Sequence, residues 1–323
     1  MGLLRMESMN KNVSQCQLIS VVICAYSLER IEMTMKCIQS ILDNTYKNVE
    51  IILVIDGNKE LKHKMESQLR AVTKILIVEN IKNEGPSVSR NRGIEHANGE
   101  IIAFIDDDAF ASSNWLETIA KDFSEYPEIL ACGGKLIPIY EENAYKLPEE
   151  LLWVVGCTYK GHPVKKQFIR NVISANMAVR KDLFNEIQFE KMFDGRNWKM
   201  EDTLFGIRLF LRNHNNVLYD PEILVYHNVS KERTKLIYLL QRSYSEGLLK
   251  YELGQVIQTN FAQKEVFYHE QNYLKLVVSS ISKNFFNIHQ MNYFLLLFST
   301  TFAVITGYVM GNILNKIHYK QDY

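Results

Sequence analysis

Four short apolar segments, each followed by polar residues, constrain the fold of this 323-residue chain most strongly. They occupy residues 19–24, 49–55, 74–78 and 101–105. Between the first two, apolar residues from Ile31 to Leu42 recur at the spacing of an amphipathic helix. Nearly continuous apolar strands that alternate with helices are typical of a parallel sheet covered on both faces. We therefore expect an α/β fold built on a mostly parallel, Rossmann-like sheet.

The ends of these strands indicate where a ligand would bind, because α/β sheets bind ligands beyond the carboxyl ends of their strands. Polar residues follow the four expected strands at 25–26, 56–57, 83–85 and 106–108. From about Ala131 the alternation weakens, and we expect a loop-rich stretch that shapes a specificity pocket rather than extends the sheet. Residues 201–213 and 231–251 are expected to form helices; basic residues on the second would face solvent, anionic headgroups or an acceptor phosphate.

Composition and missing motifs exclude several classes of protein. Lysine plus arginine and aspartate plus glutamate both number 37, which argues against binding nucleic acid through bulk charge. The five cysteines include no C-x-x-C pair, so neither a zinc cage nor a disulfide framework is indicated. The sequence also lacks the glycine-rich motif of dinucleotide dehydrogenases, the P-loop and the G-x-S-x-G motif of hydrolases.

The C-terminal part of the chain carries a candidate membrane helix. Residues 293–314 contain no charge, and about 20 such residues cross a hydrocarbon core of roughly 30 Å. A buried core helix is the alternative, because serine, threonine and asparagine dilute the apolarity. Gly307 and Gly311 form a G-x-x-x-G motif, which hints at helix packing. Residues 1–17 lack the apolar core of a signal peptide. We expect a single-pass protein of the cell membrane with its catalytic part in the cytoplasm.

The sequence accordingly predicts five segments. They are a tail at 1–17, a catalytic domain at 18–230, a helical segment at the membrane surface at 231–290, a membrane-spanning helix at 293–314 and a short tail at 315–323.

Three consecutive carboxylates, Asp106, Asp107 and Asp108, follow the last of the four apolar runs. Two carboxylates about 4 Å apart repel by roughly 4 kcal/mol at an effective dielectric of 20. The triplet therefore calls for a compensating cation or raised pKa values, unless it is a solvated turn. Mg²⁺ and Mn²⁺ suit carboxylate oxygens together with substrate phosphates. Because alternate residues of an extended segment point the same way, we expect Asp106 and Asp108 to face one ligand and Asp107 to face elsewhere.

Three further patterns contain candidate functional residues. Glu201-Asp202 begins an expected helix and would supply a general base, or simply complement the helix N-terminus. The segment from Gly85 to Gly93 contains Arg90 and suggests a helix that holds an anionic ligand, although an exposed arginine is often only a solubility residue. His227 would add a metal ligand or a phosphate contact, or be a core histidine.

Taken in order, five of these segments resemble family 2 glycosyltransferases of the GT-A fold. They are residues 19–26, 54–57, 85–93, 104–108 and 201–208. The resemblance covers about residues 18–230 and implies an inverting enzyme that uses a nucleotide-diphosphate sugar with Mg²⁺ or Mn²⁺. UDP is expected from the family pattern alone. Ser89 and Met200 depart from the usual residues, which bears on the shape of the pocket.

The resemblance also implies a role for each matching residue. Asp202, with Glu201, would be catalytic; Asp108 and His227 would ligate the metal. The nucleotide sugar would contact Ala25, Tyr26, Asp56, Arg90, Asp106 and Asp107. Further contacts to the acceptor or the diphosphate are expected from Asn176, Arg233 and Arg242.

Within the family, the chain looks most like archaeal lipid-linked-sugar transferases such as glucosyl-dolichyl-phosphate glucuronosyltransferases. An acceptor hydroxyl needs a base, whereas a lipid phosphate is already anionic and needs none, so Glu201-Asp202 favours a hydroxyl on a lipid-linked or cell-surface saccharide. The alternatives are a polyprenyl- or dolichyl-phosphate sugar synthase and, from a different class, a catalytically inactive nucleotide-sugar-binding membrane protein.

Overall fold

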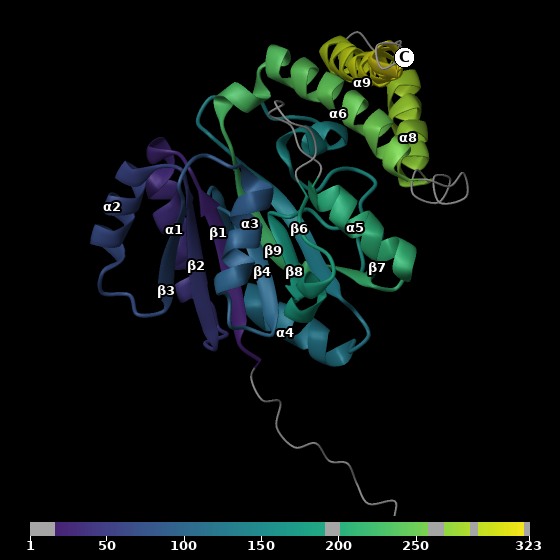
Figure 1. Cartoon of the computed structure of the whole chain (residues 1–323). Coiled ribbons are helices and arrows are strands. Elements are labelled where there is room, and N and C mark those ends of the chain that lie inside the picture. Colours follow the sequence, from purple (N-terminus) through teal and green to yellow (C-terminus); the bar gives the residue numbers. More distant parts are fainter. Residues whose placement is uncertain (1–16, 191–200, 258–267, 285–289, 320–323) are drawn as a thin grey trace, which may run out of the picture.

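The computed structural model describes residues 17–190, 201–257, 268–284 and 290–319. Most of the expected N-terminal tail, the last four residues of the C-terminal tail, part of the expected 231–290 segment, and Met200 lie outside these residues. The described chain forms a mixed sheet flanked by helices, with three further helices beyond one end of the sheet (Figure 1).

The first four strands pair in parallel, as expected from the apolar runs. Their order across the sheet is β3 (Ile75–Asn80), β2 (Val49–Asp56), β1 (Ile19–Ala25) and β4 (Ile101–Asp106). The connecting helices are α1 (Ile31–Leu42), α2 (Lys59–Leu69) and α3 (Pro86–His96).

The sheet continues beyond β4, so the expectation that the chain stops extending it near Ala131 is wrong. Strand β8 (Asn176–Arg180) runs antiparallel between β4 and β6 (Ala131–Tyr140), and β6 pairs in parallel with β9 (Val217–Val229). The short strands β5 (Ala109–Ala111) and β7 (Gln167–Phe168) pair antiparallel with β9. The pattern was hidden because Gly133-Gly134 interrupts the apolar run of β6, with a register shift after Gly134. A Cβ on Gly134 would lie 2.1 Å from the Ile223 carbonyl oxygen, so only glycine fits there.

Helices cover both faces of the sheet, and alternate residues of each strand pack into one of two cores. Val21 and Ile23 pack with α1 and with Trp115 of α4 (Trp115–Glu125). Val22 packs on the other face, with residues of α3 and of α5 (Glu201–Arg212). This arrangement confirms the expected α/β fold.

Three long helices follow the last strand. They are α6 (Leu236–Val256), α8 (Tyr268–Asn284) and α9 (Met291–Tyr319). Figure 1 shows them gathered beyond the end of the sheet at which β1, β2 and β4 finish. The expected helix at 231–251 begins later, because residues 231–234 form a 3-10 turn, η4 (Lys231–Thr234). Two of its basic residues differ from expectation, because Arg242 and Lys250 both pair with Glu246 rather than face solvent, whereas Lys231 and Lys235 are exposed.

Close packing at glycines joins α9 to α6. A Cβ on Gly307 would lie 2.0 Å from the Tyr244 carbonyl oxygen, and one on Gly247 would lie 2.0 Å from the Val304 carbonyl oxygen. A Cβ on Gly311 would meet the ring of Tyr251. The G-x-x-x-G motif of α9 therefore packs within this chain, with small residues letting the two backbones approach.

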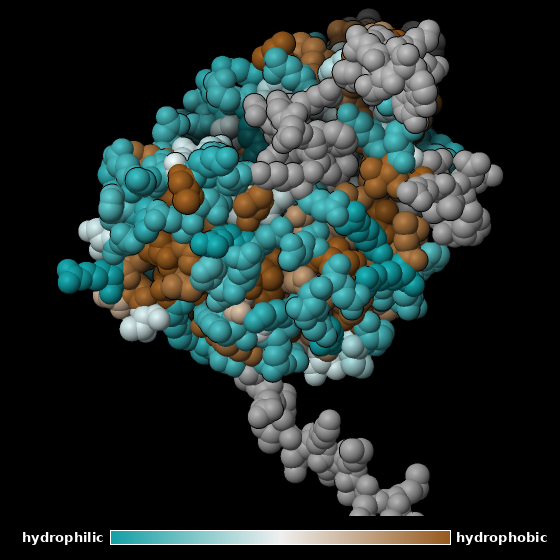
Figure 2. Space-filling model, viewed as in Figure 1, coloured by the Kyte–Doolittle hydropathy of each residue, from teal (hydrophilic) through white to brown (hydrophobic). Residues whose placement is uncertain are grey.

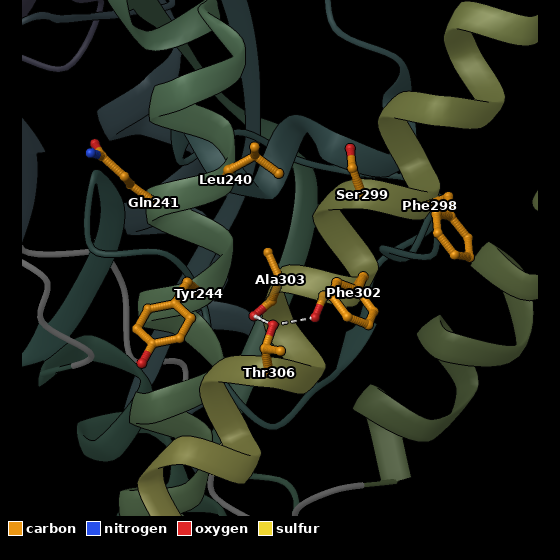
Figure 3. Close-up of a pocket in the computed structure, with 8 residues that line it drawn as sticks. All are labelled: Leu240, Gln241, Tyr244, Phe298, Ser299, Phe302, Ala303 and Thr306. Atoms are coloured by element: carbon orange, nitrogen blue, oxygen red, sulfur yellow. Dashed lines mark hydrogen bonds between the residues drawn. The ribbon is translucent and has the colours of Figure 1, made fainter.

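Within the described residues, α9 is a helix long and apolar enough to cross a membrane, over Met291–Asn315 with a mean hydropathy of 1.7. Three of its polar side chains form hydrogen bonds within the helix, which makes them compatible with an apolar environment. The hydroxyl groups of Ser299, Thr300 and Thr306 donate to carbonyl oxygens one turn earlier in the same helix, as Figure 3 shows for Thr306. A shallow apolar groove of about 510 Å³ runs between α6 and α9 (Figure 3).

Candidate active site

Asp106 ends β4, and Asp107 and Asp108 form the turn that joins β4 to β5, at the carboxyl end of the central strands. His227 reaches it from β9, because the pairing of β5 with β9 sets Ala109 opposite His227. The Nε2 atom of His227 lies 3.8 Å from Oδ2 of Asp106 and 3.4 Å from Oδ1 of Asp108. The structure thus brings together Asp106, Asp108 and His227, although through a tight turn rather than the extended segment we expected.

Electrostatic coupling holds this group in a charged state. Burial acts to lower the pKa of His227, but the carboxylates of Asp106 and Asp108 raise that pKa well above the ordinary value. In return, and against the effect of burial, His227 holds the pKa values of both carboxyl groups below their usual range. The other ring nitrogen of His227, Nδ1, lies 3.9 Å from the buried thiol of Cys157, a neighbour that the site prediction missed.

Asp107 turns away from this group, as expected. Its side chain is buried and accepts a hydrogen bond at Oδ1 from Nη1 of Arg30, at 2.9 Å. Within the described part of the chain, Oδ2 of Asp107 has no hydrogen-bond partner. Burial raises the pKa of Asp107 to about 7, although Arg30 acts to lower it. Sequence reasoning missed Arg30, which stands in the 3-10 turn η1 (Leu28–Arg30) with no motif to mark it.

A second arm of the site reaches the triplet through Arg90. This buried guanidinium donates from Nη1 to Glu201 at 2.5 Å and from Nη2 to the Ser174 hydroxyl at 2.9 Å. It also lies 3.6 Å from Oδ1 of Asp106. Arg90 was expected to hold an anionic ligand; the anion it holds most closely is the chain's own Glu201.

Asp202 is the second residue of helix α5 and lies beside this ion pair. Its Oδ2 accepts a hydrogen bond from the Ser174 amide at 3.1 Å, and its Oδ1 accepts one from the Thr203 amide at 2.7 Å. Burial, together with the negative charge of Glu201, raises the pKa of Asp202. A carboxylate with a raised pKa and a fixed orientation is suited to accept a proton.

The expected nucleotide contacts lie at the ends of β1 and β2. Tyr26 follows β1 and is 51% exposed, whereas Ala25 is buried and offers a ligand only its backbone. Both carboxylate oxygens of Asp56 accept backbone hydrogen bonds, Oδ1 from Glu84 and Oδ2 from Gly85. Asp56 therefore fixes the turn before α3.

The three expected acceptor or diphosphate contacts lie in different places. Arg233 is beside the triplet: it acts to lower the pKa of Asp108, and it donates to the Val155 carbonyl at 2.9 Å. Arg242 lies on α6, where it pairs with Glu246. Asn176 is only 1% exposed, and its amide group donates to the carbonyls of Lys135 and Ile223. The core thus occupies both donors of Asn176, and we correct the expectation that it contacts a ligand.

The donor set of Asp106, Asp108 and His227 fits a divalent cation. One ligand atom from each residue lies within 4.8 Å of the others. The Asp106 side chain is 39% exposed, so the group can be reached from solvent. Two carboxylate oxygens and an imidazole nitrogen are ligands that Mn²⁺ and related ions accept, with positions left for a substrate.

A mixed α/β sheet with carboxylates at the carboxyl end of its central strands is the arrangement expected of a glycosyltransferase of the GT-A fold. The family model for Glycosyl transferase family 2 matches residues 20–188, and the chain belongs to this family. The comparison confirms the expected family, fold class and enzyme class.

Individual proteins agree with this assignment. The chain is 29% identical over 301 residues to a glucosyl-dolichyl phosphate glucuronosyltransferase of Haloferax volcanii, covering 91% of this chain and 96% of that protein. It is 25% identical over 241 residues to the putative glycosyltransferase EpsH of Bacillus subtilis, covering 72% and 67%. The structure of TarS from S. aureus superposes with a TM-score of 0.50 at 15% identity, covering 80% of this chain and 43% of TarS, which shows the fold alone.

Proposed function

We propose that this glycosyltransferase moves a sugar, with inversion, from a nucleotide-diphosphate donor to a hydroxyl group of a lipid-linked or cell-surface saccharide. UDP is the expected nucleotide. The observation that carries the proposal is the convergence of Asp106, Asp108 and His227 at the carboxyl end of the sheet. The donor would lie between this group and the exposed ring of Tyr26.

Asp106, Asp108 and His227 would hold a divalent cation, Mn²⁺ or Mg²⁺. When bound, such an ion supplies Lewis-acid neutralisation of the charge that develops on the leaving diphosphate. Arg233 extends the positive charge on this side of the site, since it already interacts with Asp108. His227, whose raised pKa favours the protonated form, would have to lose that proton before its imidazole could serve as a metal ligand.

Asp202 would be the general base, which removes the proton from the acceptor hydroxyl. Ser174 and Thr203 hold its carboxylate in one orientation, and burial raises its pKa toward the range in which a base works. Glu201 would act through Arg90, because the two form a buried ion pair. This pair ties the start of α5 to Asp106 and keeps the base at a fixed place relative to the metal group.

The C-terminal helices would attach the protein to the membrane, where a lipid-linked acceptor is also found. Helix α9 would anchor the chain as a single pass, with the catalytic part in the cytoplasm, and the five-segment division stays a prediction. The name of the Haloferax relative contains a dolichyl phosphate-linked sugar, which supports a lipid-linked saccharide as acceptor. A polyprenyl-phosphate sugar synthase remains the second candidate, because an anionic lipid phosphate would use the same anchor.

A donor screen tests the proposal. Full-length protein in detergent is incubated with Mn²⁺, lipid-linked saccharide acceptors and a panel of nucleotide sugars, and released nucleoside diphosphate is measured. We expect release with at least one UDP-sugar that depends on both acceptor and metal. No release with any donor would favour an inactive nucleotide-sugar-binding protein, and release driven by bare polyprenyl phosphate would favour the synthase.

A further inference from the structure

Arg30 contacts the acidic triplet on the side away from His227. Its Nη1 atom lies 2.9 Å from Oδ1 of Asp107 and 3.2 Å from Oδ2 of Asp108. Asp108 turns its other oxygen, Oδ1, to His227 at 3.4 Å. The two oxygens of this carboxylate are thus divided between a fixed positive charge and the proposed metal group.

We propose that Arg30 is a positioning residue that weakens the binding of a free divalent cation to the triplet and thereby makes metal binding depend on the nucleotide diphosphate. The inference rests on the proposed metal-assisted function and adds an order of binding to it.

The charge of Arg30 opposes the binding of a free cation at the triplet. The triplet places carboxylates at three successive positions, two of them buried, and such a cluster attracts cations strongly. Arg30, whose side chain is 31% exposed, neutralises part of that charge, and its guanidinium does not lose its proton in the physiological range. A free cation therefore meets a smaller negative potential than the three aspartates alone would create. When a cation arrives bound to a diphosphate, the diphosphate brings negative charge of its own, and Arg30 attracts that negative charge.

Arg30 also lies beside the end of the site at which the nucleotide would bind. The Cζ atom of Arg30 lies 5.6 Å from the centroid of the Tyr26 ring, within the range of a cation–π contact. Tyr26 is half exposed, whereas the Asp107 side chain on the other side of Arg30 is buried. Arg30 is thus in contact both with the aromatic ring that would receive the base and with a carboxylate that would receive the metal. A nucleotide stacked on Tyr26 would change the surroundings of the same guanidinium.

Titration of the full-length protein with Mn²⁺, followed by the EPR signal of free Mn²⁺, tests the inference with and without UDP. In Arg30→Gln, we expect Mn²⁺ without UDP to bind at least about fivefold more tightly than in the wild type, because one positive charge is lost near the site. We also expect the gain in Mn²⁺ affinity on adding UDP to shrink by about the same factor. Arg92→Gln, on the exposed face of α3, is the matched control and should behave like the wild type.

A second variant separates charge from local structure. Arg30→Lys keeps the positive charge beside Asp107 and Asp108 but replaces the guanidinium that contacts both carboxylates. If Arg30 acts through charge, the Mn²⁺ affinity without UDP returns to within about twofold of the wild type. If the affinity remains shifted, Arg30 acts only through local structure and the inference is wrong.

The outcomes distinguish the inference from the proposed function. Wild-type protein that binds Mn²⁺ with UDP, while Arg30→Gln shows unchanged or weaker binding of Mn²⁺ alone, overturns the inference and leaves the function standing. Wild-type protein that binds no Mn²⁺, with or without UDP, overturns the metal-assisted function and the inference with it.

Discussion

At the scale of single residues, Arg90 holds the two halves of the candidate site together. It forms a buried ion pair with Glu201 at the start of α5 and lies 3.6 Å from Asp106 at the end of β4. These residues are far apart in the sequence, and no local pattern pairs them. Removing one partner of a buried ion pair typically costs about 3–5 kcal/mol, so Arg90 is a structural residue as much as a functional one.

Asp202→Asn tests the proposed base. Loss of the proton acceptor should lower turnover by about 10²- to 10⁴-fold, while UDP and Mn²⁺ bind as in the wild type. Steady-state kinetics and calorimetry measure the two effects. The exposed Asp182→Asn is the control. Turnover that survives in Asp202→Asn would instead support a lipid phosphate acceptor.

The pH profile carries a second signature of the same residue. The pKa of Asp202 is raised above the ordinary aspartate value of 3.8, and only the ionised form accepts a proton. Thus kcat/KM should fall as the pH decreases through the raised pKa, and this acidic limb should be absent from the residual activity of Asp202→Asn. An identical limb in the variant would assign the titration to another group.

At the scale of elements, the sequence predicts those helices and strands whose formation depends on a local pattern of apolar residues. The four apolar strands, the helix at 31–42 and the long apolar helix are recognisable because one face or one run dominates each. Strands β6 and β9 cannot be recognised in this way, because Gly133-Gly134 interrupts the pattern of β6 and Asp220-Pro221 interrupts that of β9. The pairing of these two strands also depends on partners that are distant in the sequence. Arg30 was missed for the same reason: only the fold brings η1 to the turn after β4.

Gly307→Val tests the packing of α9 on α6. The added Cβ would lie 2.0 Å from the Tyr244 carbonyl oxygen, so the helices must separate. We expect the free energy of unfolding to fall by about 1–3 kcal/mol, as is typical of overpacking. Thermal unfolding in detergent measures it. Ile305→Val, on the exposed face of α9, should change little; equal stability of the two variants would mean that the glycine contact is not made.

At the scale of the whole molecule, most of the exposed large apolar side chains of the described residues lie on the C-terminal helices. Figure 2 shows hydrophobic surface at the top of the molecule, and smaller apolar patches among teal surface lower down. Leu236 and Ile237 of α6 and Phe298, Phe302 and Ile305 of α9 are each more than half exposed. Large apolar side chains exposed in this way on neighbouring helices are expected to meet another apolar phase. Because these helices lie beyond the carboxyl ends of the central strands, a bilayer bound there would be on the side of the active site.

Phe298→Glu combined with Phe302→Glu tests this attachment. A carboxylate costs about 3 kcal/mol at the centre of a bilayer, so the double variant should float far less with lipid vesicles than the wild type. Ile81→Glu is the matched control, because Ile81 is 95% exposed on the catalytic domain. If the double variant floats as well as the control, α9 is not the membrane anchor.

The central claim is that Asp106, Asp108 and His227 hold a divalent cation that binds the diphosphate of the donor. Calorimetric titration of UDP into wild-type protein and into Asp108→Asn, each with and without Mn²⁺, tests it most directly. We predict Mn²⁺-dependent binding of UDP to the wild type and at least a hundredfold weaker binding to the variant in Mn²⁺, about 2.8 kcal/mol. Equal affinity of the two proteins for UDP in the presence of Mn²⁺ would contradict the claim.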